Sequence, residues 1–176
     1  MNRFALRPVQ DDDHAWLVEL HNDPVVLHHM THDKYITIKE HQIWWDKVSK
    51  DPYQLRMVFT VDGCRAGFAK FYDIYALNCS CVLGADMCYE YRGKGYAKEM
   101  WHLMLEMCFN DFLLHRVSLT TAEYNHVGLH LYQKLGFIEE GRLTQSLFRR
   151  GEFHDQVCMY MLEDTWKHLS QGRIQP

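Results

Sequence analysis

The chain has 176 residues, of which 47% are hydrophobic, so it is long enough and apolar enough to bury the core of one domain. The formal charge of −4 and the pI of about 6.3 argue against a general nucleic-acid binder or a protein of anionic membrane surfaces, since both are usually basic. The sequence has no apolar run of roughly 18 residues, no long apolar signal region after Met1 and no Cys-x-x-Cys pair, which predicts a single cytoplasmic domain over 1–176 with reduced cysteines.

The first third of the chain predicts one strand and three helices. Residues 4–9 alternate weakly and predict a strand, and the three aspartates at 11–13 suit the start of a helix that runs to Leu20. Pro24 breaks that segment before a short helix over 25–30. Thr37 and Glu40 have the spacing of a capping box and open a third helix that ends near Val48.

The remaining two thirds alternate between strands and helices. Strands are predicted over 55–61 and 65–75 around the turn Asp62-Gly63, then over 79–87 and 116–121, and a last hairpin joins 137–146 to 152–162. Helices are predicted over 96–109, over 125–135 with Gly136 as its C-terminal cap, and over 163–170. This order predicts a mixed α/β (α+β) fold with a largely antiparallel sheet of about six or seven strands and about four helices on both faces.

The most informative stretch is 83–98, where a strand enters a glycine-containing turn that opens a helix. The first turn of a helix has backbone N–H groups without partners, and the helix dipole favours negative charge there. Gly93 and Gly95 let the backbone approach a bulky anion, and Arg92, Lys94 and Lys98 add positive charge. The pattern predicts a site for a phosphate or pyrophosphate.

Other phosphate loops do not fit this stretch. An ATP-type loop ends in Gly-Lys-Ser/Thr, whereas Lys94 is followed by Gly95. A dinucleotide fingerprint needs a third glycine where this chain has Lys98. An Arg-x-x-Gly-x-Ala run at 92–97 remains, and an ordinary strand-to-helix turn would explain it equally well if it stood alone.

A second motif decides between these interpretations. Residues 125–137 resemble the Asn-x-x-Ala-x-x-Leu-Tyr-x-Lys-Leu-Gly-Phe segment of the GNAT acetyltransferases, with Gly128 where alanine is usual, and 92–97 resembles their pyrophosphate loop. The Asn22-Asp23-Pro24 run and the Trp44-Trp45 pair are similar to a branch that acetylates ribosomal-protein N-termini, spermidine or amino-sugar nucleotides. The resemblance covers about 3–163 and implies the GNAT fold.

The resemblance implies acetyl-CoA as the acetyl donor and assigns residues to it. The pantetheine arm is expected on the main chain of Ala85, Asp86 and Met87, where an N–H can also stabilise an oxyanion. Tyr132 matches the proton donor of the family, because a positioned phenol can protonate the leaving thiolate. Other cofactor-binding residues implied by the motifs are Arg92, Gly93, Lys94, Gly95, Tyr96, Ala97, Lys98 and Asn125.

The acceptor site is less defined by the sequence. Some relatives carry a glutamate as base where this chain has Thr120, so Asp86, His41 or water are alternatives. Residues expected to touch the substrate are His28, His29, His41 and Trp44. The acceptor is expected to be the primary amine of a small molecule, either a polyamine or an amino-sugar nucleotide. A protein N-terminus is the alternative acceptor, and a non-catalytic CoA-binding module the alternative function.

Two histidine groups raise the question of a metal. One is His28, His29 and His32, and the other is His126 with His130, at the spacing of helical zinc ligands. His126 is not followed by the glutamate of a His-Glu-x-x-His motif, so surface or packed histidines are favoured and no metal is predicted. A homodimer is left open.

Overall fold

The strands pair with one another in a single mixed sheet. The computed structural model describes residues 3–30 and 34–171 and divides the chain into two compact units, one of residues 1–74 and 83–104, the other of 75–82 and 105–176. The seven strands are ordered β1-β2-β3-β4-β5-β7-β6, and of the pairs with a described register only β4 with β5 is parallel. The predicted largely antiparallel sheet is therefore confirmed.

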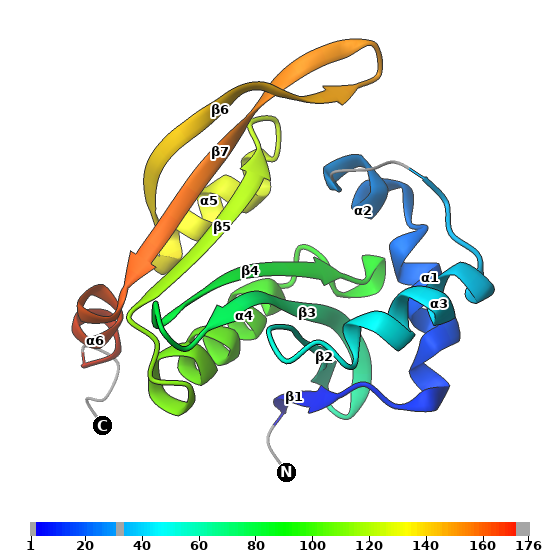
Figure 1. Ribbon diagram of the computed structural model, residues 1–176, viewed down its shortest axis with the longest axis horizontal. Coiled ribbons are helices and arrows are strands. Elements are labelled where there is room, and N and C mark those ends of the chain that lie inside the picture. Colours follow the sequence, from blue (N-terminus) through cyan, green and yellow to red (C-terminus); the bar gives the residue numbers. More distant parts are fainter. Residues whose placement is uncertain (1–2, 31–33, 172–176) are drawn as a thin grey trace. The chain divides into compact units, whose positions relative to one another are not determined.

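The first unit contains the N-terminal strands and four helices (Figure 1). Its elements are β1 (Phe4–Pro8), α1 (His14–His21), α2 (Pro24–His29), α3 (Ile38–Val48), β2 (Leu55–Val61), most of β3 (Cys64–Tyr75), the second half of β4 (Ser80–Met87) and most of α4 (Tyr96–Glu106).

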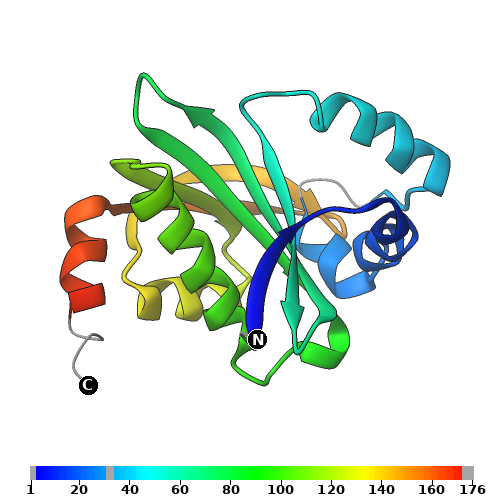
Figure 2. The ribbon, with the colours of Figure 1, turned by 90° about the horizontal axis from the view of Figure 1, so that it is seen from below.

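Local sequence signals explain where the helices of this unit begin. Pro24 is the first residue of α2, and the Asp23 carboxylate accepts hydrogen bonds from the next two amides. Thr37 and Glu40 form the expected reciprocal capping box at the start of α3. Figure 2 shows α4 on one face of β2 and β3, with α1, α2 and α3 on the other.

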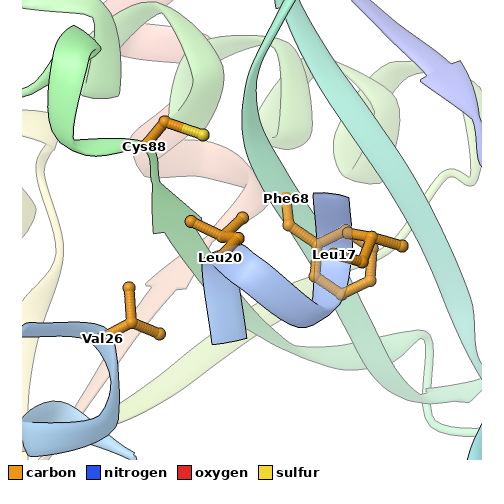
Figure 3. Packing of buried hydrophobic residues seen from close by; sticks show 5 residues of the cluster. All are labelled: Leu17, Leu20, Val26, Phe68 and Cys88. Atoms are coloured by element: carbon orange, nitrogen blue, oxygen red, sulfur yellow. The ribbon is translucent and has the colours of Figure 1, made fainter. Parts of the chain in front are cut away.

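Apolar side chains close the space between the helices and the strands of this unit. Leu17 and Leu20 of α1 and Val26 of α2 pack with Phe68 of β3 and Cys88, which follows β4 (Figure 3). On the α4 side, Met100 and Met104 are fully buried, as expected for the inward face of that helix. Burial of large apolar side chains on both faces of β3 holds the strand in place between the two helical layers.

The second unit contains the C-terminal strands and helices. Its elements are the first half of β4, β5 (Arg116–Ala122), α5 (His126–Leu135), β6 (Ile138–Arg149), β7 (Glu152–Leu162) and α6 (Glu163–Gln171). Gly136 ends α5 in the left-handed conformation, with φ of 99°, as predicted. The β6–β7 hairpin turns at Arg150 and Gly151, which both have positive φ.

One helix differs in detail from the sequence prediction. The helix predicted to reach 109 ends as an α-helix at Glu106 and continues as a π-helix over Met107–Asp111, where the Phe112 amide donates to the Met107 carbonyl. The described residues form six α-helices, and each of them lies in a segment that the sequence predicts to be helical.

Candidate active site

The predicted anion site is an open loop between β4 and α4. Gly93 and Gly95 have φ of 72° and 81°, a conformation that favours glycine, and a Cβ on either would meet no atom within 4 Å. Lys94 is exposed on this loop, α4 begins at Tyr96, and Lys98 is exposed in the first turn of that helix. The loop therefore presents free space, positive charge and a helix N-terminus at one place, which suits a phosphate group.

Arg92 connects this loop to the rest of the first unit. Its Nε donates to the Met87 carbonyl at 2.9 Å, and its Nη2 donates to Asp23 at 3.0 Å. Burial opposes ionisation of the Asp23 carboxyl, but the Arg92 guanidinium outweighs it, and the pKa of Asp23 lies below its ordinary value. Within the described chain, Nη1 of Arg92 is buried and has no partner. Contact of Arg92 with a cofactor stays a prediction, and its observed role is to brace the loop.

The strand that precedes the loop packs closely against β3. The main chain of Ala85, Asp86 and Met87 forms the end of β4, as the resemblance requires. A Cβ on Gly67 of β3 would lie 2.7 Å from the Asp86 carbonyl oxygen and 3.0 Å from the Met100 sulfur. Only glycine at 67 allows the two strands to approach this closely.

A cavity of about 340 Å³ opens beside this strand, entirely within the first unit. Residues of α1, α3, β2, β3 and β4 line it, and the chemically active ones are His21, Glu40, His41, Arg56, Lys70, Tyr72 and Asp86, with Trp44 beside them. His41 and Trp44 are thus found where an acceptor could bind. His28 and His29 are not among the lining residues, and His32 lies outside the described residues.

The charged groups of the cavity are mostly paired. The Asp86 carboxylate accepts from Lys70 at 2.7 Å. Burial opposes the charge on Lys70, but Asp86 outweighs that effect and the pKa of Lys70 is raised. Glu40 serves the α3 cap and pairs with Lys34, so its carboxylate is already occupied.

His41 is the buried histidine of the cavity wall. It is 3% exposed, and its Nε2 lies 3.0 Å from Nδ1 of His14. Burial, and then the neighbouring His14 and His21, lowers the pKa of His41 to about 4. The ring is therefore neutral near pH 7, and the low pKa makes it a weak base.

The second unit carries the other predicted residues. Tyr132 lies on α5, with its ring edge-on to Phe137 at 6.1 Å between centroids. Asn125 caps α5, since its Oδ1 accepts from the Gly128 amide at 3.1 Å and its Nδ2 donates to Thr121 at 2.9 Å. The cap fully explains an asparagine at this position, and a contact of Asn125 with the cofactor stays a prediction.

Several cavity residues were missed by the sequence interpretation. Arg56 and Lys70 lie in strands that are otherwise largely apolar. Lys70 shares with Phe68 and Tyr72 the face of β3 that lines the cavity. A lysine or arginine within an otherwise apolar strand could have indicated this site, since such residues are rarely buried without a partner.

Two further kinds of site were sought in the described part of the chain. No group of three or more His, Cys, Asp or Glu side chains could hold a metal ion there. None of the helices described is long and apolar enough to span a membrane.

Comparison with known proteins agrees with this geometry. Residues 3–138 match the model of the acetyltransferase (GNAT) domain. The spermidine N(1)-acetyltransferase of Escherichia coli (strain K12) is 26% identical over 170 residues, which are 96% of this chain and 91% of that protein. The crystal structure of spermidine N-acetyltransferase from Vibrio cholerae in complex with CoA and spermine superposes with a TM-score of 0.89 at 25% identity, covering 94% of this chain and 98% of that one.

A relative that is named for a different substrate also covers nearly the whole chain. The L-amino acid N-acetyltransferase AaaT of Escherichia coli (strain K12) is 24% identical over 161 residues, which are 90% of this chain and 98% of that protein.

The family match and the likeness to these acetyltransferases define an acyltransferase that uses acetyl-CoA as its donor. The chain belongs to the GNAT acetyltransferase family.

Proposed function

We propose that this enzyme moves the acetyl group of acetyl-CoA to a primary amine of a small molecule, by direct attack in a ternary complex. The observation that carries the proposal is the pair of left-handed glycines ahead of α4, directly after a strand whose Asp86 lines a buried cavity. Polyamine acceptors are suggested by the spermidine acetyltransferases among the relatives. Amino-sugar nucleotides are suggested by the family branch that the sequence resembles.

The donor side of the site follows from the first unit. Backbone amides of residues 93–98 hold the pyrophosphate, with the positive charge of Lys94 and Lys98 beside them. The main chain of 85–87 holds the pantetheine arm by strand-like hydrogen bonds, and Arg92 keeps the loop in register with β4. Acetyl-CoA supplies an acetyl group already activated as a thioester.

Proton transfers complete the reaction. Tyr132 donates its phenolic proton to the departing thiolate sulfur, a step that the general chemistry of phenols and thiols permits, with pKa values of about 10 and about 8.5. The acceptor ammonium must lose a proton before attack. His41, neutral near pH 7, and Asp86 are the groups of the cavity wall that we assign to receive it, directly or through water.

The test is release of CoA thiol from acetyl-CoA in the presence of an amine panel. The panel contains spermidine, putrescine, an amino-sugar nucleotide, L-amino acids and a peptide with a free N-terminus. Calorimetry with CoA runs in parallel. Thiol release with a small amine supports the proposal, whereas release with the peptide alone would assign a protein N-terminal acetyltransferase. Uptake of CoA without release for any amine would leave a non-catalytic CoA-binding module, and no uptake would refute the proposal.

Assembly and location complete the proposal. A homodimer stays a prediction, which sedimentation velocity can check. We infer a cytoplasmic location, where acetyl-CoA and reduced thiols are both at hand.

A further inference from the structure

Among the described residues, the wall of the acceptor cavity carries little unpaired negative charge for a polyamine. A polycation needs several carboxylates to replace the water it loses on binding. Of the two carboxylates that line the cavity, Asp86 is bonded to Lys70, and Glu40 is shared between Lys34 and the cap of α3. A polycation would therefore have to share both carboxylates with lysines of the protein.

Two cations instead stand side by side on the cavity wall. Arg56 of β2 and Lys70 of β3 are direct partners in the antiparallel register, so their side chains leave the same face of the sheet. Like charges directly opposite one another destabilise a strand pair. Asp86 offsets Lys70, but no carboxylate of the described residues lies within ion-pair distance of Arg56.

The guanidinium of Arg56 is buried with part of its donor capacity unused. Arg56 is 5% exposed. It donates to the carbonyl oxygens of Leu55 and Phe71 and to the side chain of Gln54, while its Nε has no partner in the described residues. Asp51 acts on Arg56 from a distance and through Gln54, without touching the guanidinium.

Aromatic rings hold this guanidinium at the cavity. The Tyr72 ring centroid lies 4.1 Å from Cζ of Arg56, and the Trp44 ring centroid lies 5.9 Å away. Both rings also line the cavity, and stacking on them keeps the planar group in a fixed orientation. A buried, oriented guanidinium without a counter-ion is what bidentate recognition of a carboxylate or phosphate uses.

We propose that the acceptor carries an anionic group, a carboxylate or a phosphate, in addition to its primary amine, and that Arg56 binds that group. The amine then lies on the side of the cavity formed by Asp86 of β4. The inference rests on the proposed function, since it names the acceptor class of the same site. The L-amino acid N-acetyltransferase among the relatives is named for a substrate of this chemistry, which carries an amine and a carboxylate.

The first test compares amines that differ only in the anion. Each pair is an L-amino acid against its carboxamide, and an amino sugar phosphate against the same unphosphorylated amino sugar. We expect kcat/KM to be at least about tenfold higher for the anionic member of one pair, as for a charge-assisted hydrogen bond, and the pair that responds identifies carboxylate or phosphate. Spermidine should be a poorer acceptor than that anionic amine.

The second test changes the guanidinium. Arg56→Gln should raise KM for the anionic acceptor at least about tenfold, change kcat little and leave both the uncharged partner and acetyl-CoA unaffected. Arg56→Lys should restore part of the affinity, because it keeps the charge but not the fork of donors. Arg142→Gln, at an exposed arginine of β6, is the matched control and should behave as the native enzyme.

The outcomes separate the two proposals. If no amine releases thiol, the proposed function itself fails. If spermidine is acetylated and neither anionic pair shows a preference, the N-acetyltransferase stands and the anionic acceptor is refuted. Should Arg56→Gln fail to fold, the ratio of kcat/KM between the anionic and uncharged amines of each pair, measured on the native enzyme, still tests the anionic acceptor.

Discussion

The guanidinium of Arg92 donates to the carboxylate of Asp23 at 3.0 Å and thereby joins the glycine loop to the first turn of α2. Asp23 also caps that helix through the amides of Val25 and Val26. One carboxylate therefore fixes both the start of α2 and the loop predicted to hold the pyrophosphate.

Substitutions at Asp23 should separate these two roles. Asp23→Ala removes the cap and the ion pair, and we expect the free energy of unfolding to fall by about 2 kcal/mol. Asp23→Ser keeps a capping oxygen and should lose less stability. Both should weaken CoA binding about fivefold, because Arg92 loses its anchor. Urea denaturation and calorimetry with CoA measure the two effects, and native CoA affinity in Asp23→Ser would show that the brace is dispensable.

Replacement of the Tyr132 hydroxyl tests the proton donor. Tyr132→Phe keeps the edge-on contact with Phe137 and should lower kcat about 100-fold or more, with CoA affinity unchanged. Steady-state kinetics and calorimetry give the two quantities. Tyr124→Phe, a tyrosine that packs against His154 in the same unit, serves as the control and should keep native turnover. Native turnover in Tyr132→Phe would remove this residue from the mechanism.

A methyl group at position 67 should displace the donor strand. In Gly67→Ala the new Cβ would lie 2.7 Å from the Asp86 carbonyl, so β4 must move. We expect KM for acetyl-CoA to rise about tenfold and stability to fall by about 1–3 kcal/mol. Gly141→Ala on β6 adds a Cβ that meets nothing within 4 Å and is the matched control. Equal KM values in the two variants would contradict the close approach of β3 to Asp86.

The stability of the first unit should depend on pH through Asp13. This carboxylate is fully buried and bonded to Arg7 and Arg65. Burial opposes its ionisation, but the hydrogen bonds from Arg7, the Gln10 amide and Arg65 outweigh it, and the pKa of Asp13 lies well below its usual range. A carboxyl with a depressed folded pKa stabilises the fold above the unfolded pKa, about 4, and that stability is lost as pH falls below it.

Asp13→Asn gives the measurement for this pH dependence. We expect the variant to lose about 3 kcal/mol at pH 7, because two arginines lose a buried partner. Between pH 5 and pH 3 its unfolding free energy should fall less than that of the native protein, as followed by urea titrations. If the unfolding free energies of the native protein and of Asp13→Asn fell equally with pH, Asp13 would not be the source of the pH dependence.

Local chemistry was enough to predict most elements. The capping residues Asp23 and Thr37, the Asp62-Gly63 turn and the left-handed Gly136 each act within a few residues of chain, so they are visible in sequence. The π-helical turn after Glu106 was not visible in the sequence. Apolar periodicity does not distinguish a backbone hydrogen bond to the fourth residue from one to the fifth.

The acceptor site could be predicted only in part. His41 and Trp44 lie on one predicted helix, three positions apart. Arg56 and Lys70 are 14 positions apart and meet only through the register of β2 with β3. The hairpin turn alone does not reveal that register, because a bulge between Phe59 and Thr60 shifts it by one residue.

Asp86 is proposed to serve both substrates, with its main chain on the donor and its side chain in the acceptor cavity. Occupation of either half should then alter the affinity of the other, and by thermodynamic necessity each ligand must shift the dissociation constant of its counterpart by the same factor. Titrations of CoA with and without bound amine, and of the amine with and without CoA, would measure the two shifts in dissociation constant. Equal shifts would show that the two ligands are energetically coupled, as their sharing of Asp86 predicts.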